Sequence, residues 1–191
     1  NDTWEWDGNT WSQRSNSGPT TRGAMAYDEA RAQVIYYGNI FSGTWSWDGA
    51  TWELRDPNGP NRPSGGTMAY DPTRQVIMLV SKVSEGLSTW EWDGSHWTWR
   101  STESQPSWDR GLAFDRRRGV MVMLCGGGGG DEAYTWEWAG THWALCYTGG
   151  PNPREQFAMA YDEALGVTVL FGGEGAGYYN DTWEWDGTHW E

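Results

Sequence analysis

Four arginine residues recur along the chain, each shortly before a segment of small, apolar residues. A guanidinium group binds carboxylates and other anions through paired hydrogen bonds. If a repeating fold brings the four side chains to one face, they form a ring of positive charge that suits an anionic ligand. Their alternative role is structural, because each has a proline nearby and could brace neighbouring repeats. The four residues are Arg22, Arg62, Arg110 and Arg154.

Aromatic residues outside the repeated positions form a second group of candidate binding residues. Exposed aromatic side chains are typical anchors for proteins or sugars. The residues of this group are Phe41, Trp108, Tyr134, Tyr178 and Tyr179.

Histidine and glutamate residues recur too regularly to form a catalytic or metal site. His96, His142 and His189 each stand one residue before a tryptophan. Equivalent slots of different repeats lie far apart, so these side chains cannot share a metal ion. The same argument applies to the recurring glutamates Glu5, Glu91, Glu137 and Glu184. We therefore predict no catalytic residue, no metal, no cofactor and no enzyme activity.

The composition of the chain argues against two classes of partner, nucleic acids and membranes. The 191 residues include 27 Gly and 17 Trp, and the formal net charge is −13. An acidic surface repels phosphate backbones, which argues against nucleic acid. No apolar run is long enough to span a membrane, so no membrane contact is predicted either.

Cys125 and Cys146 are too few for a disulfide framework, and we predict that both are free thiols. Cysteine usage therefore leaves the compartment open between secreted and cytoplasmic. The chain opens on Asn1 and stops at Glu191, so we expect a processed chain or an excised piece.

Two sequence motifs alternate along the chain. The first reads TWEWDGxxW, and its first tryptophan falls at intervals of 41 to 47 residues, at Trp4, Trp45, Trp90, Trp136 and Trp183. The second lies between these copies and reads like GAMAYDEARAQVIYYG, with an aspartate after its first strand at Asp28, Asp71, Asp115 and Asp162. Repeats of this period are typical of propeller blades.

The first motif predicts a β-hairpin around its Asp-Gly pair. Asp7-Gly8 suits a two-residue type I′ turn. That turn places Trp4 opposite Trp11, as direct cross-strand neighbours. The copy at Ala139-Gly140 lacks the aspartate and is predicted to have the weakest turn.

The second motif predicts another hairpin, with its turn held by the side chain of the aspartate. Two hairpins in series make a four-stranded antiparallel sheet, whose strands we name a, b, c and d from the inside outward. No segment has helical periodicity, so the predicted fold class is all-β.

These residues resemble the kelch repeat, in which an aromatic strand is followed by Gly-Gly and then by an aromatic residue, six residues and Trp. The nearest copy is residues 169–173 with Trp183 and Trp190. The resemblance covers the whole chain and implies a kelch-type β-propeller. The second repeat has Val80-Ser81 in place of the glycine pair, which we expect to loosen its b–c connection.

The resemblance implies one propeller domain over residues 1–191. It divides into an outer c–d hairpin at 1–14 and four repeats at 20–55, 64–100, 109–146 and 154–191. The extra hairpin is either the outer half of a fifth, incomplete blade or a sign that the parent protein is longer, and we favour the second. An open arc would expose an apolar end face, which favours a homodimer.

The resemblance to the kelch repeat implies that the d–a and b–c loops meet on one face and that this face binds the ligand. The first hypothesis is a non-catalytic binding propeller that recognises a protein segment or an anionic ligand there. A carbohydrate-binding propeller that uses the loop aromatics is the alternative, and a scaffold within a larger propeller enzyme is the third. Fold alone does not choose among them.

Overall fold

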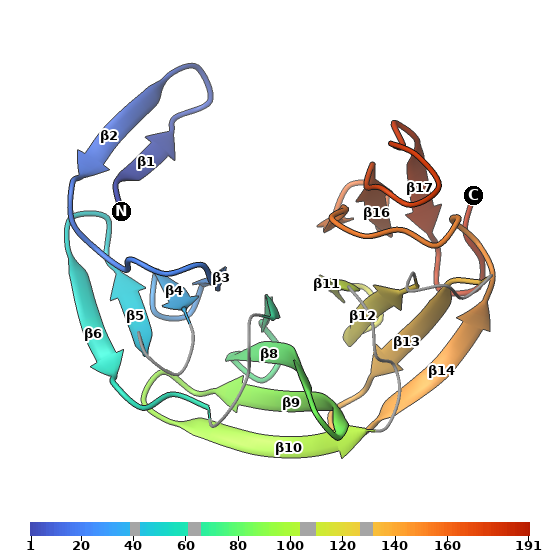
Figure 1. Cartoon of the computed structure of the whole chain (residues 1–191), viewed down its shortest axis with the longest axis horizontal. Helices are drawn as coiled ribbons and strands as arrows, with labels where there is room; N and C mark the ends of the chain where they lie inside the picture. Colours follow the sequence, from blue (N-terminus) through green and yellow to red (C-terminus); the bar gives the residue numbers. More distant parts are fainter. Residues whose placement is uncertain (39–42, 61–65, 104–109, 127–131) are drawn as a thin grey trace.

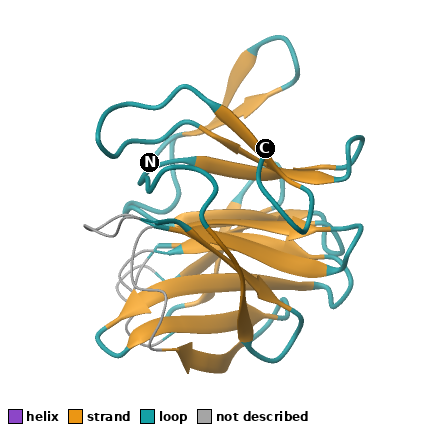
Figure 2. Cartoon of the chain, turned by 90° about the vertical axis from the view of Figure 1, so that its right-hand side faces the viewer, coloured by secondary structure: helices purple, strands orange, loops and turns teal. Residues whose placement is uncertain are grey.

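The structure, a computed structural model, describes residues 1–191 except 39–42, 61–65, 104–109 and 127–131. The described residues form seventeen strands in five antiparallel sheets. Figure 2 shows strands and loops only. Within this part of the chain, no helix is long and apolar enough to cross a membrane.

Each repeat folds into one sheet whose strands follow the order of the chain. The first small sheet pairs β1 (Thr3–Trp6) with β2 (Trp11–Ser15). Blade 1 consists of β3 (Ala24–Asp28), β4 (Gln33–Tyr37), β5 (Thr44–Trp47) and β6 (Trp52–Asp56). Blade 2 consists of β7 (Thr67–Asp71), β8 (Val76–Val83), β9 (Gly86–Trp92) and β10 (Trp97–Glu103).

The remaining two blades repeat this pattern. Blade 3 consists of β11 (Arg110–Asp115), β12 (Val120–Cys125), β13 (Tyr134–Trp138) and β14 (Trp143–Thr148). Blade 4 has β15 (Ala158–Asp162), β16 (Val167–Phe171) and β17 (Thr182–Trp185). An isolated bridge between Trp185 and Trp190 stands where a fourth strand would pair.

The sheets stand side by side around an axis and form a β-propeller (Figure 1). The innermost strands β3, β7, β11 and β15 contact one another in that order. The β1–β2 hairpin continues the series as the outer half of a further blade, beside β5 and β6. The arc is open between this hairpin and blade 4. The predicted all-β propeller is confirmed.

The hydrophobic core lies in the joints between blades. The joint between blades 1 and 2 is typical. Ile35 and Tyr37 of blade 1 pack against Met68, Leu79 and Trp92 of blade 2, and all five are buried. Similar clusters fill the joints between blades 2 and 3 and between blades 3 and 4.

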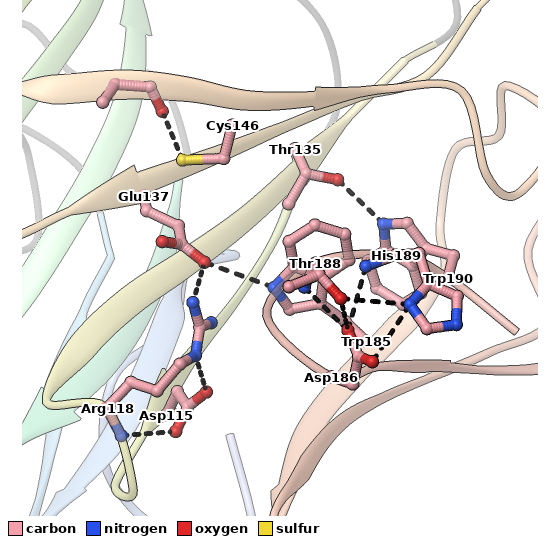
Figure 3. Close-up of polar contacts among 11 residues, drawn as sticks. Asp115, Arg118, Thr135, Glu137, Cys146, Trp185, Asp186, Thr188, His189 and Trp190 are labelled. Carbon is pink, nitrogen blue, oxygen red and sulfur yellow. Dashed lines mark hydrogen bonds and ion pairs between the residues drawn. The ribbon is translucent and has the colours of Figure 1, made fainter.

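One hydrogen bond recurs at every joint. The indole Nε1 of the tryptophan at the start of strand d donates to the hydroxyl of the threonine on strand c of the preceding blade. The four pairs are Trp52–Thr3 at 2.7 Å, Trp97–Thr44 at 2.7 Å, Trp143–Thr89 at 2.9 Å and Trp190–Thr135 at 2.8 Å. Figure 3 shows the last of these, beside the indole of Trp185, which donates to Glu137 at 3.2 Å. A buried indole N–H needs such an acceptor, so the bond fixes how neighbouring blades meet.

The predicted register of the tryptophan hairpins is wrong by two residues. Trp6, rather than Trp4, lies opposite Trp11, with their ring centroids 5.6 Å apart. The reason is that Asp7 Oδ1 accepts the backbone N–H groups of Asn9 and Thr10, at 2.8 and 2.7 Å. This side-chain capping closes a four-residue loop instead of a type I′ turn.

The aspartates of the second motif hold their turns as predicted. Asp71 Oδ1 accepts the backbone N–H groups of Thr73 and Arg74, at 2.9 and 3.0 Å. Its other oxygen accepts from the Arg74 guanidinium at 2.7 Å, and Arg74 also pairs with Glu91 on strand c. Asp115, Arg118 and Glu137 form the same network in blade 3 (Figure 3). These carboxylates are structural ion-pair partners.

The structure confirms the prediction for the two cysteines and contradicts the one for the b–c connection of blade 2. Cys125 and Cys146 do not form a disulfide, as predicted. The b–c connection of blade 2 is not loosened by Val80-Ser81. Instead β8 and β9 extend into a long ladder that reaches the Val83–Gly86 pair, because valine and serine pair in a strand where two glycines would weaken it.

Replacing Thr89 with valine tests the joint hydrogen bond. Valine keeps the shape of the side chain but leaves the buried Trp143 N–H without its acceptor, so we expect the free energy of unfolding to fall by about 1–3 kcal/mol. Urea unfolding measures it. Thr182→Val is the control: Thr182 is exposed and no indole donates to it in the described residues, so its unfolding should match that of the wild type.

Replacing Ala139 with aspartate tests the loop capping. Positive φ falls on Gly140, not on Ala139, so what this loop lacks is the carboxylate acceptor. We expect Ala139→Asp to raise the Tm at pH 7 by roughly 2 °C. The equivalent Asp186 has its pKa lowered to about 2, chiefly by the backbone hydrogen bond from His189. The gain should therefore be present above pH 4 and lost as the pH falls toward 2. A gain that survives at the lowest pH would contradict the capping.

Candidate functional site

The predicted ring of arginines is not assembled among the described residues. Arg22 is exposed in the loop before β3. Arg154 is buried, with 1% of its surface exposed. Only the backbone of Arg110 is described, paired with Cys125 at the start of β11, and Arg62 lies outside the described residues.

The aromatic candidates separate in a similar way. Phe41 and Trp108 lie outside the described residues. Tyr134 begins β13 and is 37% exposed. Tyr178 and Tyr179 follow β16, in the same loop region that Arg154 contacts. Blade 4 is therefore where three of the predicted residues meet.

Arg154 organises the loop between β16 and β17. Its guanidinium makes a bidentate ion pair with Asp181, at 2.6 and 3.0 Å, and also donates to the carbonyl oxygen of Gly172 at 2.9 Å. Its Nε donates to the carbonyl oxygen of Asn152 at 3.0 Å. The guanidinium carbon Cζ lies over the Tyr179 ring, 4.2 Å from the ring centroid. Its charge and donors are thus used within the protein.

Asp181 carries the matching negative charge. The hydrogen bonds from Arg154 lower its pKa to about 2, and Trp183 Nε1 also donates to it at 2.7 Å. Asp181 and Arg154 are both charged at neutral pH and offset each other. The pair fixes the loop and leaves no net positive charge there.

A pocket of about 380 Å³ opens beside this loop. Its polar groups are Gln156, whose amide donates to Glu174, and Glu174 itself. Tyr178 is 91% exposed and Phe171 is 55% exposed, so two aromatic side chains are available to a ligand. The remaining lining residues are Ala158, Gly172, Gly173 and Tyr179.

The backbone around the pocket is held firmly. Glu155 and Glu174 exchange two backbone hydrogen bonds, at 2.7 and 2.9 Å, and Tyr179 N donates to the carbonyl oxygen of Gly173 at 2.9 Å. Gly173 has a φ of 103°, and a Cβ there would meet the Glu155 carbonyl oxygen at 2.8 Å. The glycine is therefore required for the approach of the two segments.

Sequence reasoning missed Gln156, Glu174 and Phe171 as lining residues. Phe171 is the last residue of β16 (Val167–Phe171). Its counterparts Tyr37, Val80 and Leu124 are buried by the next blade, whereas no blade of the described residues covers Phe171. The polar pair carries no motif in the sequence, because the contact between Gln156 and Glu174 depends on the fold of the loop.

The histidines occupy equivalent loops on separate blades, as their positions suggested. Nδ1 of His96, His142 and His189 lies near the hydroxyl of the preceding residue in each loop. Among the described residues, no three His, Cys, Asp or Glu side chains come close enough to hold a metal ion.

Comparison with solved structures supports the fold. The chain is similar to a chain of the nidogen/laminin complex, with a TM-score of 0.65 and 12% identity, over 93% of this chain and 65% of that one. A protein of unknown function from Bacteroides thetaiotaomicron matches with a TM-score of 0.64 and 9% identity, over 93% and 44%. TolB from Acinetobacter baumannii matches with a TM-score of 0.60 and 11% identity, over 93% and 44%.

These similarities identify the fold alone. The chain is a β-propeller. It spans less than two thirds of each of these three chains. No protein-family model matches the sequence, and the search of curated proteins finds no match. The resemblance to the kelch repeat therefore stays a prediction.

Replacing Asp181 with asparagine tests the ion pair that holds the loop. The carboxylate pKa is about 2 in the folded state, below its value of about 3.9 in an unfolded chain. The wild type should therefore keep this stabilisation above pH 4 and lose it as the pH falls toward 2. We expect the free energy of unfolding of Asp181→Asn, measured by urea titration, to fall less steeply over that range. Glu163→Gln removes a carboxylate that is 69% exposed and pairs with Arg116 at the surface, where an ion pair adds little stability, so it serves as the control, with the wild-type slope.

Proposed function

We propose that this chain is a non-catalytic binding propeller whose ligand site is the pocket beside the β16–β17 loop, and that the ligand is a saccharide. The propeller fold is compatible with a binding scaffold. The observation that carries the proposal is the combination of two exposed aromatic side chains with a neighbouring carboxylate and amide in one pocket.

The chemistry of the pocket suits a ligand that is uncharged and rich in hydroxyl groups. The ring face of Tyr178 offers an apolar surface on which the C–H face of a sugar ring can stack. Glu174 accepts hydrogen bonds from hydroxyl groups, and Gln156 both donates and accepts them. The cavity of about 380 Å³ is within the usual size range of small-ligand sites.

An anionic ligand fits this pocket poorly. Arg154 is paired with Asp181, so the guanidinium nearest the pocket offers no uncompensated charge. Glu174 lines the pocket, and the whole chain carries a net charge of −13. An incoming anion would therefore meet repulsion at this pocket.

Replacing Tyr178 with alanine tests the proposal. Tyr178 is almost fully exposed, so the substitution should not disturb folding. A glycan array first identifies a saccharide that the wild type binds, and isothermal titration then measures its Kd. We expect Tyr178→Ala to weaken binding at least tenfold, and Tyr178→Phe, which keeps the ring, to retain most of it.

Tyr27→Ala provides the matched control, because Tyr27 is an exposed tyrosine of blade 1, away from the pocket. It should bind the saccharide as the wild type does. The proposal is wrong if no glycan binds, or if Tyr178→Ala and Tyr27→Ala give the same Kd as the wild type.

A further inference from the structure

The β1–β2 hairpin exposes side chains whose counterparts in the four blades are buried or partly buried. Trp6 is 51% exposed, whereas its counterparts Trp47, Trp92, Trp138 and Trp185 are at most 4% exposed. Trp4 and Trp11 are 49% and 64% exposed. A cluster of three exposed tryptophans on one hairpin is unusual for a protein surface and indicates that something covers them.

The same side of the molecule has an uncovered inner surface on blade 1. Met25 is 67% exposed, but its counterparts Met68 and Leu112 are 8% and 6% exposed. Tyr27 is 52% exposed, and its counterpart Phe114 is 7% exposed. Met68 of blade 2 is covered by blade 1, whose Ala24 and Ala26 pack into the cluster around it. Among the described residues Met25 and Tyr27 have no such neighbour, because the sheet of β1 and β2 contains no inner strands.

One backbone edge of β1 is also unpaired in the described residues. β1 pairs with β2 alone. The equivalent strands β5, β9, β13 and β17 each pair with a strand b on their inner edge. An open strand edge beside apolar side chains is a template for strand addition.

Glu5 adds a chemical requirement for whatever binds this edge. Glu91, its counterpart on β9, receives two arginines: Arg74 from the a–b turn and Arg100 from strand d. Glu5 receives Arg14 from strand d, at 2.8 Å. Its Oε1 accepts the Trp47 indole N–H at 3.0 Å, but within the described residues no arginine of an a–b turn reaches it, and its side chain is 38% exposed.

We infer that the β1 edge, with Trp4, Trp6, Glu5, Met25 and Tyr27 around it, is the docking site of a β-hairpin from outside these 191 residues. The occupant has the chemistry of the second motif: small residues on its first strand, branched residues on its second, and an Asp-x-x-Arg turn between them. Its second strand pairs with β1, its first strand covers Met25 and Tyr27, and its arginine reaches Glu5.

A second copy of the chain is not the occupant, because it has no free hairpin of this kind. In the described residues, the second-motif hairpins are already paired with strand c through β4, β8, β12 and β16. The docking site is at the opposite end of the arc from blade 4, which holds the pocket. The docking proposal is therefore independent of the proposed saccharide binding.

A synthetic peptide with the sequence of residues 66–82, GTMAYDPTRQVIMLVSK, is the probe. We expect it to bind the full chain at one peptide per chain in isothermal titration. It should also protect the β1 amides from hydrogen exchange. A peptide with Arg74→Glu should bind at least tenfold more weakly, because it sets two negative charges against each other at Glu5.

Met25→Glu is the variant of the chain that should block the site. Met25 is mostly exposed, so the chain should still fold, but the new charge lies where the first strand of the peptide packs. We expect at least a tenfold weaker Kd. Leu145→Glu is the matched control: Leu145 is 49% exposed on the outer strand β14, and this variant should bind the peptide normally.

A hairpin tethered to the chain tests the same site if the free peptide does not fold alone. The same hairpin, joined to Asn1 by a Gly-Ser linker, should raise the Tm, whereas a tethered hairpin with Ile77→Pro should not. The inference is overturned if neither the free nor the tethered hairpin shows these differences. It is also overturned if the free chain self-associates in sedimentation and Met25→Glu abolishes that association, since a second copy would then cover the site.

Discussion

The hydrogen bond from an indole N–H to a threonine hydroxyl of the preceding blade is the interaction on which the architecture depends. A propeller has no single centre, so its apolar side chains must be buried in flat joints between sheets. Tryptophan provides the largest apolar surface for such a joint but brings one donor with it. The threonine accepts that donor at each of the four joints, and Thr44, Thr89 and Thr135 have no exposed surface. The same pair thus buries the indole and sets the position of one blade against the next.

Charged residues stabilise the blades from within. Asp71 and Asp115 end their inner strands, cap the following turn and pair with an arginine three residues later. That arginine also pairs with a glutamate on strand c, so one guanidinium links strand a to strand c. Much of the acidic character of the sequence therefore belongs to structural ion pairs. The recurring glutamates Glu91 and Glu137 are among these ion-pair partners.

The sequence predicted the repeat, the all-β class and the capping aspartates, because each depends on local chemistry that recurs in several copies. It did not predict the register of the tryptophan hairpins. An Asp-Gly pair is compatible with both a two-residue turn and a longer capped loop, and the choice depends on which N–H groups the Asp7 carboxylate accepts. A structural role for Arg154 was one of the two predicted alternatives, but its ion-pair partner was not predicted. Its partner Asp181 is far along the chain, and only the folded loop brings the two together. Distance in sequence, rather than weakness of the motif, limited the prediction of the site.

Internal repetition turns the exceptions into informative positions. Each residue of a blade has counterparts that experience the same surroundings, so a difference in burial reports a difference in neighbours and not in residue type. Met25 and Met68 are both methionines at the same place on the inner strand, yet one is mostly exposed and the other is buried. Phe171 departs from its buried counterparts at the other end of the arc in the same way. Regular positions are explained by packing between blades. Binding functions therefore have to be sought where the regularity ends, in the β16–β17 loop and at the open edge of β1.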